Sequence, residues 1–228
     1  MVIGEKLSKV DKEILAWQIG RKPRNLWGIM KRCKQGAPKV VVNYPISKAK
    51  ADANFFPTVF WLTCPKIVSS ISKLEDRGYI GHVQRRIENN ATIFQELYEA
   101  HVEYIFIRRA LLGKDKILAI KTERQAFYKK IEQVGIGGLS DLKKVKCLHM
   151  HYAHYLATKI NPIGQLVDSV LSMSEQQDKC YVCHYAGVAE QADAADLKSA
   201  EPKGSCRFEP GPRHQKKSKL AKLSKSSG

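Results

Sequence analysis

Apolar residues recur at two different spacings along this chain, and the spacing predicts where helices and strands form. Six stretches carry them three or four positions apart, as amphipathic helices do; these are residues 8–20, 63–78, 91–112, 122–135, 140–159 and 165–173. Three shorter runs are rich in β-branched and aromatic residues, as strands are; these are residues 25–33, 38–45 and 55–62. This order predicts a single α+β domain over residues 1–185, mostly helical and with a small sheet.

Two of the predicted helices have recognisable starts. In the helix over residues 63–78, Thr63 is the expected cap and Pro65 stands in the first turn, where its missing N–H costs nothing. Gly78 is the expected end of that helix. Ser140 is the expected cap of the helix that runs on to residue 159.

No helix or strand is predicted for the last part of the chain, residues 186–228, which we interpret as a disordered basic tail. Permissible codons for residues 186–215 spell a leucine transfer RNA gene, with acceptor stem, anticodon arm, long variable arm and T-arm in the right order. We therefore interpret this segment, Cys206 included, as a reading frame that runs through a transfer RNA gene. Residues 216–228 are then translated flanking sequence, and the alternative for them is a nucleic-acid-binding arm.

Composition narrows the classes of function. The net charge of +17, from 39 Lys and Arg against 22 Asp and Glu, favours a polyanionic partner such as RNA. No apolar run approaches the roughly 20 residues of a membrane helix, and the first residues lack the apolar core of a signal peptide. We therefore expect a cytoplasmic protein without a membrane partner, whose six cysteines are reduced thiols or metal ligands.

Cysteine and histidine supply the candidate chemistry. On an ideal helix Cys147, His151 and His154 lie within about 60° of one another, and zinc and iron are bound by these side chains. Cys64 falls in a first helical turn, where unpaired N–H groups and the helix dipole stabilise a thiolate. Such a thiolate can be a nucleophile or a metal ligand. The alternative for all of these residues is an ordinary buried side chain.

Further cysteines enlarge the candidate set. Cys33 follows Arg32 at the end of a predicted strand, and Cys180 and Cys183 have the CxxC spacing of a metal knuckle or a redox pair. A structural zinc site or an iron–sulfur cluster normally takes four ligands. We therefore predict that one centre draws on a common set of residues: Cys33, Cys64, Cys147, His154, Cys180 and Cys183, with His149 as the other candidate histidine.

Common catalytic and binding motifs are missing from the sequence. It contains no phosphate-binding glycine loop, no dinucleotide fingerprint, no HExxH zinc motif and no GxSxG nucleophile motif. An RNA-recognition signature with interleaved aromatic residues is missing as well. Motifs alone therefore name no reaction.

Three blocks of the sequence carry a family resemblance: GRKPRNLWGIMKRCKQGAPKVV, FPTVFWLTCPKIVSSISKLEDRG and VKCLHMHYAHYLATKINPIG. In order and spacing they resemble the bacterial domain-of-unknown-function family 501, over roughly residues 11–183. The resemblance maps positions of the family onto these residues: Arg32, Cys33, Gly36, Pro38, Pro57, Thr63, Cys64, Pro65, Lys146, Cys147, Leu148, His149, Ala153, His154, Asn161, Pro162 and Gly164. His151 stands where the family usually carries an apolar residue. The family has no established activity, so the resemblance implies a bacterial domain but no reaction.

Three hypotheses for the function follow. The first is a Cys/His site that binds zinc or an iron–sulfur cluster, for structure or for redox chemistry. The second is a thiol-dependent enzyme with Cys64 as nucleophile and His149 or His154 as base. The third is a basic module that binds nucleic acid, with an affinity that falls steeply as salt increases.

Overall fold

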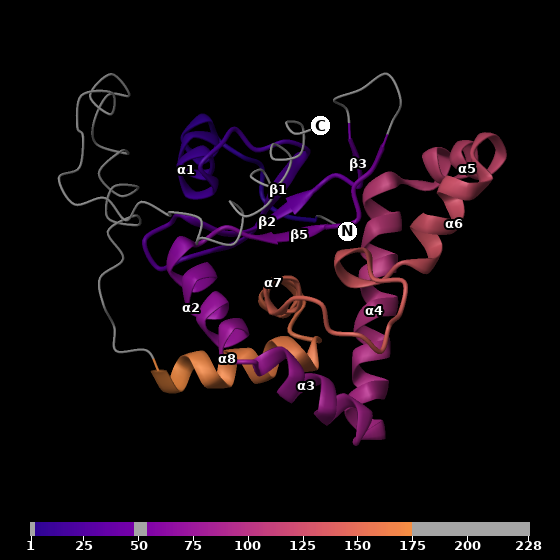
Figure 1. The fold of residues 1–228 in the computed structure, drawn as a ribbon. Helices are drawn as coiled ribbons and strands as arrows, with labels where there is room; N and C mark the ends of the chain where they lie inside the picture. Colours follow the sequence, from indigo (N-terminus) through magenta and orange to yellow (C-terminus); the bar gives the residue numbers. More distant parts are fainter. Residues whose placement is uncertain (1–2, 48–53, 175–228) are drawn as a thin grey trace, which may run out of the picture. The chain divides into compact units, whose positions relative to one another are not determined.

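The computed structural model describes residues 3–47 and 54–174, and Figure 1 shows how their helices and strands are arranged. The helices are α1 (Lys9–Ile19), α2 (Pro65–Asp76), α3 (Tyr79–Glu88), α4 (Ala91–Leu112), α5 (Lys114–Glu123), α6 (Gln125–Gln133), α7 (Leu148–Thr158) and α8 (Pro162–Ser174), with a 3-10 turn η1 (Ile136–Gly138). The strands are β1 (Leu26–Arg32), β2 (Pro38–Asn43), β3 (Ile46–Ser47), β4 (Asn54–Phe55) and β5 (Phe60–Leu62). The predicted α+β fold, mostly helical with a small sheet, is confirmed.

The sheet is antiparallel, with strand order β1-β2-β5, and the three predicted strand regions supply it. In its centre Val41 pairs with Ile29 on one side and with Trp61 on the other. Since side chains alternate along a strand, these residues face one side of the sheet, while Val42 and Phe60 face the other. The remaining two strands, β3 and β4, form a separate antiparallel pair.

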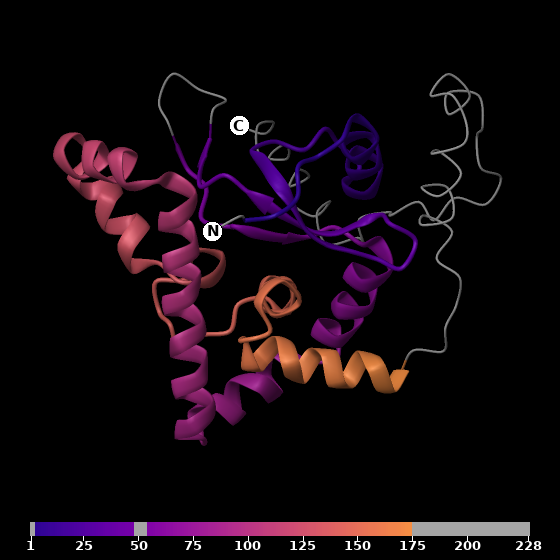
Figure 2. The same ribbon diagram turned by 180° about the vertical axis from the view of Figure 1, so that it is seen from behind.

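Helices lie on both faces of this sheet, as Figures 1 and 2 show from opposite sides. α1 covers one face, where its Leu15 packs with Ile29 and Val41. α7 lies against the other face and contacts β5. Phe60 of β5 joins residues from α2, α3, α4, α7 and α8 in the largest apolar core. The start of α7 and the end of α2 therefore lie next to the main core.

The first turn of α2 differs from the sequence prediction by one residue. Cys64, not Thr63, is the N-cap, and Pro65 occupies the first turn as expected. Thr63 instead uses its hydroxyl to donate to the carbonyl of Pro38 at 3.1 Å. This bond ties residue 63 to β2, so the helix begins only after it.

Two helices, α3 and α5, form where apolar spacing predicted none. Gly78 follows the end of α2 with a left-handed φ of 79°, as expected of a glycine that ends a helix, and it is also the residue from which α3 starts. Val83 and Ile87 of α3 then enter the main core. Gly113 joins α4 to α5 with the same φ of 79° but with an extended ψ of 159°. Short helices of this kind owe their stability to packing rather than to intrinsic propensity.

The largest departure from prediction concerns residues 140–159. Helix α7 begins only at Leu148, and the residues from Ser140 to Cys147 are not helical. Ser140 is therefore not a helix cap. Cys147 is the N-cap of α7, with extended backbone angles of φ −157° and ψ 131°.

Local and tertiary hydrogen bonds explain this late start. The Asp141 side chain accepts the N–H of Lys143 at 3.0 Å, which stabilises a turn in place of a helical turn. The N–H of Val145 donates to the side chain of Gln84 in α3 at 2.9 Å. A backbone donor that is satisfied by another helix cannot also form the intrahelical bond, so the segment stays extended until Cys147.

A fully buried arginine fixes the connection from α6 to η1. The guanidinium of Arg108 in α4 donates to the backbone carbonyls of Ile131, Val134 and Gly135, at 3.0, 2.6 and 2.9 Å. Burial lowers the pKa of Arg108 to about 10, so the side chain is still charged at neutral pH. The charge of this arginine is thus stabilised by hydrogen bonds to carbonyl groups at the end of α6.

None of the described helices is both long enough and apolar enough to cross a membrane. The described elements belong to one compact unit. The predicted tail over residues 186–228, and with it the transfer RNA interpretation, lies outside the described residues. The boundary at residue 185 stays a prediction.

Candidate metal centre

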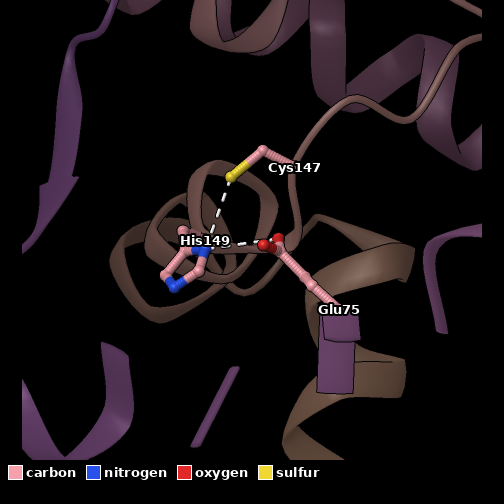
Figure 3. Close-up of side chains that lie close together, drawn as sticks. All are labelled: Glu75, Cys147 and His149. Atoms are coloured by element: carbon pink, nitrogen blue, oxygen red, sulfur yellow. Dashed lines mark hydrogen bonds and ion pairs between the residues drawn. The ribbon is translucent and has the colours of Figure 1, made fainter. Parts of the chain in front are cut away.

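Three side chains that can bind a metal ion meet between α2 and α7, as Figure 3 shows: Glu75, Cys147 and His149. Glu75 lies in the last turn of α2, Cys147 precedes the first residue of α7, and His149 lies in the first turn of α7. One oxygen, one sulfur and one nitrogen of these residues all lie within 4.8 Å of one another. All three residues are partly buried.

The side-chain atoms converge on Nδ1 of His149. This nitrogen lies 3.4 Å from Sγ of Cys147 and 3.2 Å from Oε1 of Glu75, the two interactions drawn as dashed lines in Figure 3. Oε1 of Glu75 also accepts the N–H of Leu148 at 2.6 Å. The Cys147 side chain makes no capping bond, so the carboxylate of Glu75 supplies the acceptor that the start of α7 needs.

The opposite ring nitrogen of His149 is held by α2. Nε2 lies 3.1 Å from the carbonyl oxygen of Val68 and 3.4 Å from the hydroxyl of Ser72. A carbonyl oxygen only accepts, so Nε2 carries a proton and donates it to Val68. In the neutral ring Nδ1 then has the lone pair. Metal-binding histidines are usually oriented by such a bond from their other ring nitrogen to a carbonyl.

The charges in this cluster support one another. Burial opposes a charged His149, but its hydrogen bonds to Cys147 and Glu75, with the charges of those groups, raise its pKa to about 10. Burial alone would raise the pKa of Glu75, but the bonds from His149 and Leu148 lower it overall. The position between the three side chains therefore favours a positively charged group, either a protonated His149 or a bound cation.

Cys33 and Cys64 lie elsewhere. Cys33 follows β1 and packs with Ala37 and Ile14, and Cys64 is buried in the main core. Cys64 and Glu75 stand at opposite ends of α2, about 16 Å apart along the helix axis. Within residues 3–47 and 54–174, Cys33 and Cys64 join no group of three His, Cys, Asp or Glu ligand atoms at metal-binding separation.

Of the predicted set, the structure thus brings together Cys147 and His149. The other two cysteines of the set, Cys180 and Cys183, lie outside the described residues.

The expected helical face with Cys147, His151 and His154 is not present. Cys147 precedes α7 and has extended backbone angles, so the spacing argument for a shared face does not apply to it. His151 and His154 are fully buried within α7. The ring of His151 lies near that of His101 and the ring of His154 near that of Tyr104, both in α4.

Asn161 orients these two buried histidines. Its Oδ1 accepts the N–H of Gly164 at 3.0 Å, so its amide nitrogen is the donor to Nδ1 of His151 (3.2 Å) and of His154 (3.3 Å). Nε2 of His154 lies 3.1 Å from a carboxylate oxygen of Glu103. Burial lowers the pKa of both rings. Both are therefore neutral and hydrogen-bonded, which fits a structural role in the core.

Glu75 is the residue of this centre that the sequence reasoning did not find. It stands beside Asp76 in KLEDRG, and residue type does not distinguish the two acids. A weak signal was available in the helical spacing, because Val68, Ser72 and Glu75 recur at intervals of four and three. Each of these three residues of α2 has an atom at hydrogen-bonding distance from His149.

Comparison with known families agrees with the resemblance found in the sequence. A family model described as "Protein of unknown function (DUF501)" matches residues 29–169, a range that includes Glu75, Cys147 and His149. No curated protein and no solved structure matches the chain. Since the matched range covers more than half of its length, the chain belongs to the DUF501 family.

Proposed function

We propose that this protein binds a zinc ion through Glu75, Cys147 and His149. The observation that carries the proposal is the convergence of a carboxylate oxygen, a sulfur and Nδ1 of an imidazole on one small region. Each of these atoms can supply an electron pair, so a proton or a cation has to lie between them. Carboxylate, thiolate and imidazole are the three ligand types that zinc takes in proteins.

The surroundings of the three side chains support metal binding. The bond from Nε2 of His149 to the carbonyl of Val68 leaves Nδ1 of the neutral ring available as a ligand. The N–H of Leu148 occupies Oε1 of Glu75, and the second carboxylate oxygen is a further potential ligand atom. Two backbone groups thus orient two of the three ligands before any ion arrives.

Zinc fits this group better than an iron–sulfur cluster does. Such clusters are bound mainly by cysteine thiolates, and the group contains one cysteine, Cys147. A zinc ion with three protein ligands has a fourth position for water or a substrate. When bound in this way, zinc lowers the pKa of its water to near 7 and can support hydrolytic chemistry.

The test is the zinc content of the full chain, expressed without a histidine tag. We expect one zinc ion per chain, removable by a chelator, and a loss of at least tenfold in affinity in Cys147→Ser, His149→Gln and Glu75→Gln. Glu75→Gln is informative because the amide oxygen can still accept the N–H of Leu148 while the carboxylate charge is gone. Cobalt(II) substitution should give a sulfur-to-metal charge-transfer band that Cys147→Ser abolishes.

Matched controls separate this centre from other thiols. Cys33→Ser and His82→Gln remove the same side-chain types from positions outside the group and should leave the affinity within twofold. The double variant Cys180→Ser/Cys183→Ser tests the CxxC pair. Zinc that disappears in this double variant but persists in the three variants of the proposed centre contradicts the proposal.

A second candidate function is a thiol-dependent reaction at Cys147. The observation that favours it is the 3.4 Å separation between Sγ of Cys147 and Nδ1 of His149, which is the contact a nucleophile makes with its base. This replaces Cys64, the predicted nucleophile, which is buried in the main core. In metal-free protein, this candidate requires iodoacetamide to alkylate Cys147 faster than Cys33 and Cys64, and His149→Gln to abolish the difference.

A further inference from the structure

The helices α5 and α6 form a hairpin that carries a small core of its own. Figure 1 shows the hairpin beside β3 and away from α7. Ile120 and Ile131 of the hairpin pack with Ile46 of β3 and Leu112 of α4 in this core. The outer surface of the hairpin is separate from the candidate metal centre, which lies between α2 and α7.

Positive charge dominates this outer surface. The hairpin exposes six cationic side chains, Lys114, Lys116, Lys121, Arg124, Lys129 and Lys130. Two exposed acids, Asp115 and Glu123, oppose them. The third acid of the hairpin, Glu132, is paired with Arg109 at 2.7 Å. The local charge therefore favours a polyanion, as the net charge of the whole chain does.

Several of these cations lie over aromatic rings. Arg124 lies 4.5 Å from the ring centroid of Phe127, and Lys121 lies 5.8 Å from that of Tyr128. Lys116 lies 5.7 Å from the ring centroid of Tyr44.

Tyr44 continues the aromatic surface onto β1. It stacks on Trp27, with ring centroids 5.4 Å apart and planes 20° apart. Trp27 is 50% exposed. Cationic groups and aromatic rings thus alternate from α6 across to β1.

The surface is hollowed at the start of α6. A hollow of about 430 Å³ is lined by Arg124, Gln125, Ala126, Phe127 and Lys130. Two cations and an aromatic ring therefore border a space that is large enough for one nucleotide. A guanidinium and an ammonium group bind phosphate oxygens, and an aromatic ring offers a face on which a base can stack.

We propose that the α5–α6 hairpin binds single-stranded nucleic acid, with Arg124 and Lys130 on the phosphates and Phe127 beside a base. A single strand fits better than a duplex, because only unpaired bases can stack on Phe127 or Trp27. An anionic membrane would meet the same cations. It requires exposed apolar side chains as well, and among the described residues of the hairpin only Leu118 is a large, strongly exposed apolar side chain.

The test uses the full chain and a fluorescent, mixed-sequence RNA of 20 nucleotides in an anisotropy titration. Arg124→Ala/Lys130→Ala should weaken binding at least tenfold and reduce the slope of log affinity against log salt by about 1.4, since each lost phosphate contact contributes about 0.7. Phe127→Leu keeps an apolar side chain in the small core and should weaken binding at least fivefold through lost stacking. The control Lys9→Ala/Lys12→Ala removes the same charge from exposed positions on α1 and should stay within twofold.

The possible outcomes decide the proposal in either direction. If Arg124→Ala/Lys130→Ala and Lys9→Ala/Lys12→Ala lose the same affinity for the RNA, net charge alone attracts it and the proposal is overturned. Binding only to the same sequence as a duplex, only to vesicles with phosphatidylserine, or to no probe also overturns it. Cys147→Ser should bind the RNA as tightly as the unmodified chain does. The RNA result therefore does not depend on whether the zinc proposal is correct. Circular dichroism of each variant confirms that the fold is retained.

Discussion

Acidification from pH 7 to pH 5 should destabilise this protein through its buried histidines. His101 in α4 and His151 in α7 are fully buried. Burial, reinforced by the neighbouring histidines, lowers the pKa of His101 from 6.5 to about 4 and that of His151 from 6.5 to about 3. At pH 5 both rings are therefore neutral in the folded protein but protonated in the unfolded chain. The unfolded chain binds more protons, so stability is complete above pH 6.5 and is lost as the pH falls toward the folded pKa values.

The size of the loss follows from the pKa of the unfolded chain. Each ring that stays neutral at pH 5 costs about 2 kcal/mol between pH 7 and pH 5, because pH 5 lies about 1.5 below the unfolded pKa. His101 and His151 together give a loss of about 4 kcal/mol. The pKa of His154 is lowered as well, which acts in the same direction. His149 acts in the opposite sense, because the stability from its raised pKa is complete below pH 6.5 and is lost as the pH rises toward about 10. Most of it is already present at pH 7, so between pH 7 and pH 5 it offsets less than about 1 kcal/mol.

The assay is urea unfolding followed by circular dichroism at pH 7, 6 and 5, with a chelator present so that bound metal does not contribute. His101→Gln removes one titrating ring, and the loss between pH 7 and pH 5 should shrink by about 2 kcal/mol, whatever the stability of the variant at pH 7. His82→Gln, at an exposed position, is the matched control and should keep the full loss. A loss below about 2 kcal/mol in the unmodified protein refutes the reasoning.

Two further predictions concern stability, both measured by urea unfolding at pH 7. Arg108→Met should lower the free energy of unfolding by about 3–5 kcal/mol, since the carbonyls of Ile131, Val134 and Gly135 lose their donor. Its control, Arg109→Met, breaks one exposed ion pair with Glu132 and should cost less than about 1 kcal/mol. Gly135→Ala should destabilise by about 1–3 kcal/mol, because a Cβ there would come to 2.1 Å from Nδ1 of His101. Gly81→Ala, inside α3 with its nearest neighbour 3.6 Å away, should instead stabilise by about 0.5–1 kcal/mol. The same sign for both glycine variants contradicts the packing argument.

The elements that apolar spacing specified strongly were predicted well. The regions 25–33 and 38–45 became β1 and β2, whereas in the predicted strand over residues 55–62 only residues 60–62 form β5 and Phe55 belongs to β4. The long helix over residues 91–112 was predicted with the bounds that α4 has. In these segments local preference and burial agree, since the residues that favour an element also form the face that it buries. The two helices that were not predicted, α3 and α5, are short, and each begins at a glycine with positive φ.

The sequence by itself determined the family, the class of fold and two of the three residues of the candidate site. Cys147 and His149 were identified because cysteine and histidine are chemically distinct wherever they stand in a chain. Glu75 was decided only by the tertiary structure, because a carboxylate becomes a potential ligand when α2 packs on the start of α7. The start of α7 was decided in the same way, by the bond from Val145 to Gln84, a residue 61 positions away. The spacing of residues along the sequence predicts one helix or strand at a time. A binding site depends on the distances between helices and strands, and only their packing determines these distances.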